Sequence, residues 1–212
     1  VGSTASALTS TVAYTGAIST AFLGLVGIDR IAFGGEAIAS VSAGSLAYVD
    51  IWFVVDASHS MAIGATATDQ ALMLSSPNVG CTIACHMATG NDTISKARKA
   101  GATLRIDVVK SAISQILAKA RAMQTASIAA GHGSTIRIGF FTLSNSLTRK
   151  LAVTADLDAV ATALAAIDID SALAQTGTNF HASLNALATT AMTIGTGKTA
   201  ASPKVFVVLI SD

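Results

Sequence analysis

The segment at residues 54–61, VVDASHSM, places a carboxylate and two hydroxyls at alternating positions. Asp56, Ser58 and Ser60 form a D-x-S-x-S pattern that directly follows an apolar run. Oxygen ligands of this kind favour hard cations such as Mg²⁺, Mn²⁺ or Ca²⁺ over softer metals. The spacing therefore indicates a cation site, provided that other oxygen-bearing residues reach the same place in the fold.

Two more oxygen-bearing residues stand at the ends of expected elements. Thr178, in the turn TGTN at residues 176–179, precedes a segment with helical spacing, and Asp212 ends the run LISD. In an open α/β sheet, ligands bind in the crevice at the carboxyl ends of the strands. We therefore expect Thr178 and Asp212 to lie at the same rim of the sheet as the D-x-S-x-S segment.

Short apolar runs predict the strands that position these side chains, at residues 51–55, 136–141 and 205–210. The first and third runs lack polar alternation, which is typical of strands buried on both faces of a parallel sheet. Helical spacing of apolar residues predicts amphipathic helices at residues 106–123, 157–167 and 180–191. This order predicts an α/β fold with a mostly parallel sheet, and we expect the Met and Phe side chains in its core. Periodicity alone also allows a buried helix for each run, but flanking Gly and β-branched residues favour strands.

Residues 64–102 interrupt this alternation and predict an insertion that ends in a short helix. The insertion contains Cys81 and Cys85, the only cysteines, in the segment GCTIACH. An even number of cysteines in a polar segment favours a disulfide in an oxidising compartment. Free thiols, a zinc site that includes His86, and haem attachment at a lengthened C-x-x-C-H remain alternatives.

Residues 1–46 are rich in Ala, Ser, Gly and Thr and predict an N-terminal extension. Within it, a short helix is expected near residues 20–26 and a strand near residues 31–42. The domain itself is expected at residues 47–212. Because the chain ends at Asp212, directly after an apolar run, we expect the C-terminal part of that domain to be missing.

The composition narrows the classes of function. The 212 residues carry a net charge of +1 with 12% charged residues, which argues against a nucleic acid partner because phosphates require a basic face. No stretch approaches the roughly 20 apolar residues of a membrane span. The one basic cluster is expected to be a solvated helix face, with contact to anionic lipids as the alternative: Lys96, Arg98, Lys99, Arg105 and Lys110.

Three segments, DIWFVVDASHSM, GTNFHASLNAL and KVFVVLISD, resemble the von Willebrand factor A (vWA) domain family over residues 49–212. The resemblance implies a Rossmann-like, doubly wound sheet with a metal-ion-dependent adhesion site (MIDAS). It implies that Ser58 and Ser60 ligate Mg²⁺, Mn²⁺ or Ca²⁺ directly, that Asp56 and Asp212 bind it directly or through water, and that Thr178 joins when ligand binds. One coordination position is then left for the Asp or Glu of a protein partner.

One residue departs from the family pattern, because His59 stands between the two motif serines where Gly is usual. If the turn required φ above zero, His59 would be strained there. Its ring could instead cover the metal or contact the partner. His181, three residues after Thr178, could also approach the site, although a position on a helix surface is the simpler interpretation.

Further segments, AFLGLVGIDRIAF, GCTIACH and ARKAGATLRIDVVKSAI, resemble TadG-like proteins of the Tad (Flp) pilus machinery. This resemblance implies a periplasmic or surface protein, anchored in the inner membrane by a segment missing here, with pilus or secretion components as partners. No general base stands near Asp56, so we expect a binding module and not an enzyme. The alternatives are a cytoplasmic vWA module that serves an ATPase or metal chelatase, and a divalent-metal phosphatase or nuclease.

Overall fold

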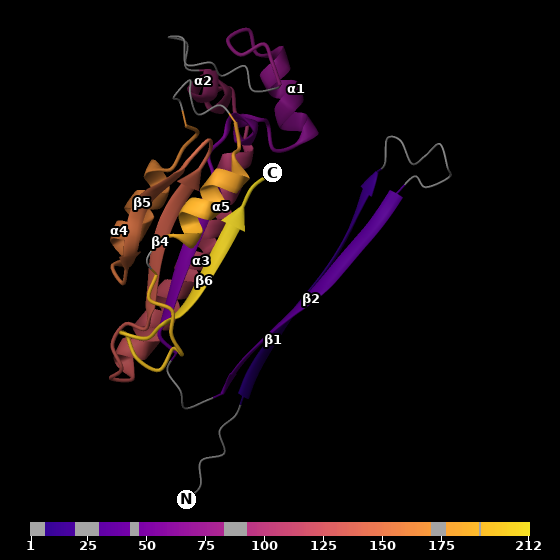
Figure 1. Ribbon diagram of the computed structural model, residues 1–212. Coiled ribbons are helices and arrows are strands. Elements are labelled where there is room, and N and C mark those ends of the chain that lie inside the picture. The colour runs from indigo at the N-terminus through magenta and orange to yellow at the C-terminus, as the bar shows by residue number, and fades with distance from the viewer. Residues whose placement is uncertain (1–6, 20–29, 43–46, 83–92, 171–176, 191) are drawn as a thin grey trace, which may run out of the picture. The chain divides into compact units, whose positions relative to one another are not determined.

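The structure, a computed structural model, describes residues 7–19, 30–42, 47–82, 93–170, 177–190 and 192–212 (Figure 1). It divides into two units, Val1–Ser45 and Leu46–Asp212, each of which is described by itself. Among the described helices, none is long and apolar enough to cross a membrane.

The first unit contains a β-hairpin of two 13-residue strands, β1 (Ala7–Ser19) and β2 (Arg30–Ser42). They pair antiparallel without a register shift, from Ala7 opposite Ser42 to Ser19 opposite Arg30. Strand β2 occupies the position of the strand expected in the N-terminal extension, whereas β1 was not expected. The helix expected near residues 20–26 lies outside the described residues.

Aromatic side chains cover glycines across this hairpin. Tyr14 pairs with Gly35 and Phe33 pairs with Gly16. A methyl group on either glycine would collide with the ring opposite, so each ring lies across its partner. Such aromatic–glycine pairs fix strand register where the glycine itself offers no side chain to pack. Tyr14 and Phe33 share one face of the hairpin and are 57% and 48% exposed.

The second unit is built on a four-stranded, mostly parallel sheet with the order β5-β4-β3-β6. Its strands are β3 (Val49–Asp56), β4 (Ile136–Leu143), β5 (Leu147–Thr154) and β6 (Lys204–Ile210). Strand β3 pairs parallel with β4 and β6, and β5 pairs antiparallel with β4. The three strands predicted from apolar runs are therefore confirmed as β3, β4 and β6, and β5 is an additional strand.

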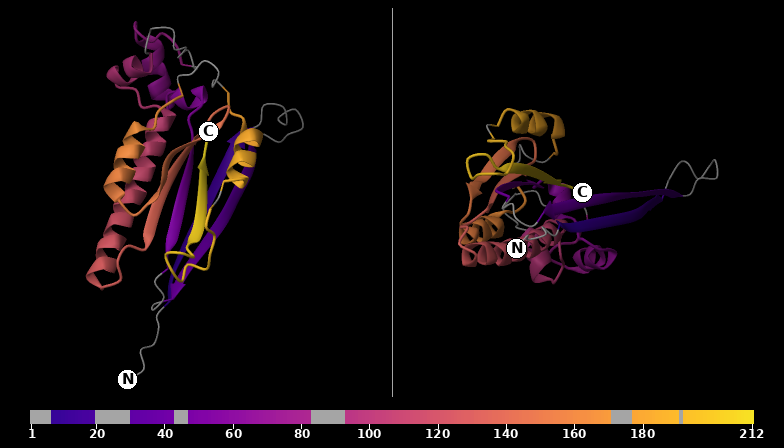
Figure 2. Two further views of the ribbon diagram at one scale, coloured as in Figure 1. Left: turned by 60° about the vertical axis from the view of Figure 1, so that its left-hand side comes forward. Right: turned by 90° about the horizontal axis from the view of Figure 1, so that it is seen from below.

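Helices cover both faces of this sheet, as Figure 2 shows. On one face, α3 (Arg105–Ala129) and α4 (Leu157–Ala166) pack over Phe53, Val55, Ile138 and Phe140. On the other face, α5 (Phe180–Ala188) supplies Leu187 to a smaller cluster. That cluster is centred on Trp52, Val54, Phe141 and Leu143. The expected mixed α/β fold is thus observed, with its core on the two faces of β3 and β4.

The insertion contributes two short helices, α1 (Ala67–Ser75) and α2 (Thr93–Lys99). Thr66 and Asp69 start α1 with a capping box, in which each side chain accepts the backbone N–H of the other residue. An isolated bridge between Gly64 and Leu104 joins the two ends of the insertion. The insertion therefore leaves and rejoins the domain at one place, directly before α3.

Strand β6, at one edge of the sheet, exposes several apolar side chains. Phe206, Val207, Val208 and Leu209 of β6 are between 37% and 52% exposed, so the expectation that this run is buried on both faces is wrong. Among the described strands, β6 has a neighbour only on its β3 side. The expectation that the Met and Phe side chains lie in the core is wrong for Met123, Phe33, Phe180 and Phe206, which are exposed.

Candidate functional site

The D-x-S-x-S segment forms a tight loop at the carboxyl end of β3. Asp56, the last residue of the strand, is fully buried, and its Oδ1 accepts the backbone N–H of Ser58 at 2.8 Å. The backbone N–H of Ala57 donates to the carbonyl of Leu143 at 2.8 Å, which ties the loop to the end of β4. A 3₁₀ helix, η2 (His59–Ala62), follows and turns the chain away from the sheet.

A continuous set of hydrogen bonds joins this loop to the end of β6. The Oγ atoms of Ser58 and Ser60 lie 3.0 Å apart, and Ser60 Oγ donates to Asp212 Oδ1 at 2.8 Å. Ser211 Oγ donates to Asp56 Oδ2 at 2.5 Å. Because β3 and β6 are parallel neighbours, their carboxyl ends meet at one rim. The structure therefore brings four of the five expected site residues together: Asp56, Ser58, Ser60 and Asp212.

Thr178 lies against the loop that follows β4. Its neighbour Asn179 donates its backbone N–H to the carbonyl of Ser144 at 2.7 Å and caps the start of α5 with its side chain. Thr178 itself is half-buried. Within the described residues, no hydrogen bond links it to Asp56, Ser58 or Ser60. Thr178 is thus placed at the rim formed by β3 and β4 but is not joined to the other four.

The two histidines expected near a partner have different positions. His59 is only 5% exposed, and its Nε2 lies 3.1 Å from the carbonyl oxygen of Asp170. Since His59 begins a 3₁₀ helix, where φ is negative, the strain expected for positive φ does not arise. His181 is exposed on α5, with its Nε2 3.1 Å from the side-chain amide of Asn185.

Two residues that the sequence did not indicate complete the site. Arg105, the first residue of α3, forms an ion pair through its Nη1 with Asp212 Oδ2. Ser211 binds Asp56, as described above. Ser211 directly precedes a residue that was expected at the site, and Arg105 belonged to the basic cluster. Their contacts depend on how α3 and β6 pack, which local sequence does not reveal.

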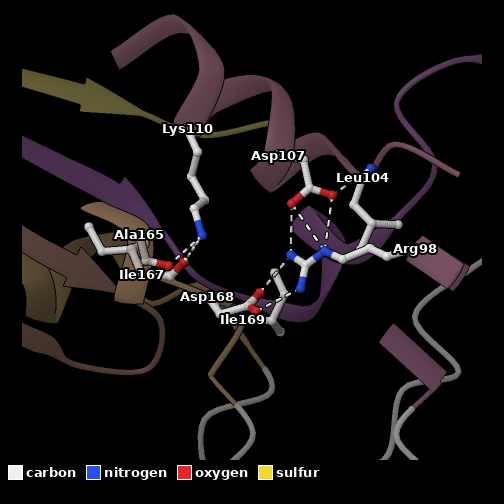
Figure 3. Close-up of polar contacts among 8 residues, drawn as sticks. All are labelled: Arg98, Leu104, Asp107, Lys110, Ala165, Ile167, Asp168 and Ile169. Atoms are coloured by element: carbon white, nitrogen blue, oxygen red, sulfur yellow. Dashed lines mark hydrogen bonds and ion pairs between the residues drawn. The ribbon is translucent and has the colours of Figure 1, made fainter. Parts of the chain in front are cut away.

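Two cations of the basic cluster, Arg98 and Lys110, contact other parts of the domain (Figure 3), whereas Lys99 is exposed, as expected for a solvated face. The Arg98 guanidinium binds Asp107 at 2.8 Å and Asp168 at 2.7 Å. Lys110 Nζ donates to the carbonyls of Ala165 and Ile167, at 2.9 and 2.7 Å. The insertion, α3 and the end of α4 are therefore held together by these cations.

The Arg98 ion pairs also hold the segment that contacts the D-x-S-x-S loop. Asp168 is two residues from Asp170, whose backbone N–H donates to the carbonyl of Ala57 at 2.8 Å and whose own carbonyl meets His59. The hydrogen bonds that Arg98 donates to Asp168 raise the pKa of Arg98. Burial is the largest single influence on Asp168 and opposes its ionisation. The hydrogen bonds from Arg98 and from the backbone N–H of Ile169, together with the positive charges of Arg98 and Lys110, outweigh burial and lower the pKa of Asp168. Arg98 thus helps to hold residues 168–170 against the D-x-S-x-S loop.

Replacing Arg98 with Gln should lower the free energy of unfolding by about 1–2 kcal/mol at neutral pH, because both carboxylates lose a partly screened partner. Since the pKa of Asp168 is lowered by folding, the ion pair stabilises above the unfolded-state pKa of about 3.9. This contribution is lost as the pH falls through the folded-state pKa. The free energy of unfolding, measured by urea unfolding between about pH 7 and pH 2, should therefore decrease less on acidification in Arg98→Gln than in the wild type.

The matched control is Arg121→Gln. Arg121 pairs with Asp158, whose side chain is 87% exposed, and donates to the carbonyl of Leu157 at 2.9 Å, a contact that does not titrate. An exposed pair contributes at most about 1 kcal/mol, so this variant should follow the wild-type pH profile. Identical profiles for Arg98→Gln and the wild type would contradict a stabilising role of the Arg98 ion pairs.

The cysteines are described only in part. Cys81 is half-buried and disulfide-bonded, whereas Cys85 and His86 lie outside the described residues. Among the residues that the structure describes, no group of three or more His, Cys, Asp or Glu side chains is placed to hold a metal ion.

Comparison with known proteins finds solved structures of low similarity but no matching family or curated protein. An uncharacterised membrane-spanning protein from Vibrio fischeri has 16% identity and a TM-score of 0.39, over 66% of this chain and 47% of that chain. The PilB minor pilin from Streptococcus sanguinis has 15% identity and a TM-score of 0.41, over 87% of this chain and 38% of that chain.

The D319A mutant of that pilin has 12% identity and a TM-score of 0.36, over 68% of this chain and 31% of that chain. The chain spans less than half the length of each of these solved chains. At such scores, the likeness carries no conclusion about activity. Any function has to be inferred from the residues at the rim of the sheet.

Proposed function

We propose that the chain is a metal-dependent protein-binding module, in which a divalent cation at the rim of the sheet captures a carboxylate of a partner protein. The observation that supports this most strongly is the hydrogen-bonded set that joins the D-x-S-x-S loop to Asp212. Its oxygens come from two strands that are far apart in the sequence and parallel neighbours in the sheet. The sheet order and the helices on both faces agree with a doubly wound, Rossmann-like vWA arrangement.

The donors present fit a hard divalent cation. Asp56 is a fully buried carboxylate, and none of the ion pairs among the described residues includes it. A buried charge is costly unless it is paired or bound to a metal. Ser58 and Ser60 would supply neutral oxygens beside it, and Asp212 a second carboxylate. These residues would hold Mg²⁺, Mn²⁺ or Ca²⁺, the ions that prefer such ligands.

The charge balance favours binding over catalysis. Asp56 and Asp212 neutralise two positive charges, and the hydroxyls add none, so the cation would remain attractive to an incoming Asp or Glu. His59 is buried against Asp170 and is not placed to act as a general base. The proposed role is therefore adhesion or assembly without an enzymatic reaction. The resemblance of three sequence segments to TadG-like proteins supports placing this role in an exported protein of the Tad (Flp) pilus assembly type.

The test is a titration of the full chain with Mn²⁺, in which electron paramagnetic resonance measures the free and bound Mn²⁺. One Mn²⁺ should bind per chain and be displaced by excess Mg²⁺ or a chelator. Acetate should then lower the water relaxivity of the bound Mn²⁺, because a carboxylate replaces a coordinated water. Acetamide, its neutral counterpart, should leave the relaxivity unchanged. Absence of Mn²⁺ binding at millimolar concentration would refute the proposal.

A further inference from the structure

Asp212 is bound on both of its carboxylate oxygens in this structure. Oδ1 accepts from Ser60 at 2.8 Å, and Oδ2 forms the ion pair with Arg105. The Arg105 side chain is 37% exposed and that of Asp212 19%. A guanidinium therefore already neutralises one of the two carboxylates that the proposed cation would use.

Arg105 has room to leave this position. A hollow of about 250 Å³ lies beside the pair, lined by Met61, Ala65, Val108 and Val109 together with Arg105 and Asp212. The Arg105 side chain is partly exposed and can change rotamer, which leaves the backbone hydrogen bonds of α3 intact. Release of the guanidinium from Asp212 thus requires no unfolding of the helix.

We infer that Arg105 is a built-in counter-cation that competes with the divalent metal for Asp212. The inference rests on the proposed function and concerns the regulation of the same site. Without metal, Arg105 keeps Asp212 paired and aligned on Ser60. A divalent cation that approaches the same carboxylate is repelled by the guanidinium until the ion pair breaks, since like charges within a few ångströms disfavour each other.

The experiment compares Mn²⁺ affinity in the wild type, Arg105→Gln and Arg105→Lys, each as the full chain. Removal of the positive charge in Arg105→Gln should tighten Mn²⁺ binding by about three- to tenfold, because a partly exposed ion pair is screened and worth little more. Arg105→Lys keeps the charge and should bind close to the wild-type affinity. The matched control is Arg121→Gln, which loses a guanidinium of α3 whose partners are Asp158 and the carbonyl of Leu157, and which should keep the wild-type Mn²⁺ affinity.

A second measurement needs no variant. In the wild type, the Nε–H nuclear magnetic resonance signal of Arg105 should shift when Mg²⁺ is added, as the guanidinium leaves Asp212. An unshifted signal at saturating Mg²⁺, or an Arg105→Gln variant with unchanged or weaker Mn²⁺ affinity, would overturn the inference while the proposed function stands. If neither the wild type nor Arg105→Gln binds Mn²⁺, the proposed function fails and the competition fails with it.

Discussion

Replacing Asp56 with Asn should weaken Mn²⁺ binding by about a hundredfold, since a carboxylate that binds the cation directly or through water matters at least as much as the outer partners whose loss costs about 10- to 100-fold. Asp56 is fully buried at the end of β3, and its two oxygens accept from Ser58 and Ser211. Asn keeps the shape of the side chain but removes its charge. The loss should therefore appear in the metal titration, while circular dichroism and the melting temperature change little.

Asp158→Asn is the matched control for this variant. Asp158 is a carboxylate of α4 whose side chain is 87% exposed and which pairs with Arg121. Its replacement should leave Mn²⁺ affinity at the wild-type value. If Asp56→Asn bound Mn²⁺ as tightly as Asp158→Asn, the cation would have to bind elsewhere on the chain, and the rim of the sheet would lose its proposed role.

Replacing Phe140 with Ala should lower the free energy of unfolding of the second unit by about 3–5 kcal/mol. Phe140 is fully buried in β4, and its ring lies 5.8 Å from that of Phe53. Removal of the ring leaves a cavity between the sheet and the helices α3 and α4. Urea unfolding followed by far-ultraviolet circular dichroism measures the loss.

Phe206→Ala is the control for Phe140→Ala, because Phe206 lies two strands away in the same sheet but is 52% exposed. Its replacement should change the free energy of unfolding by less than about 1 kcal/mol. Equal losses for the two variants would mean that Phe206 is buried in solution by something that contacts β6.

The core of the fold could be predicted because its signals are local. The runs that became β3, β4 and β6 are continuous and apolar, and the helices α3, α4 and α5 show clear spacing. Strand β5 was missed because Arg149 and Lys150 interrupt its apolar residues, and an edge strand tolerates them. Strand β1 was missed because its Thr, Ser and Ala residues gain stability only by pairing with β2.

The part of the site that lies at the ends of the strands could be predicted from the sequence. Asp56 and Asp212 could be placed together because they follow strands expected to be parallel. The burial of His59 could not be predicted, because this burial depends on the segment at residues 168–170. Arg98, from another helix, holds that segment in place. Side-chain pairs such as Arg105 with Asp212 depend on helix orientation, about which a one-dimensional pattern carries no information.

The two outer strands of the sheet set a limit on self-association. Strand β5 carries the exposed cations Arg149 and Lys150, and like charges on two such edges repel each other. Strand β6 presents apolar side chains on both of its faces. If two of these four-stranded sheets joined through β6, the outer strands of the combined sheet, among the strands that the structure describes, would be the repelling β5 strands. Backbone pairing between sheets of the second unit would then stop at two sheets, because the β5 edges do not pair with each other.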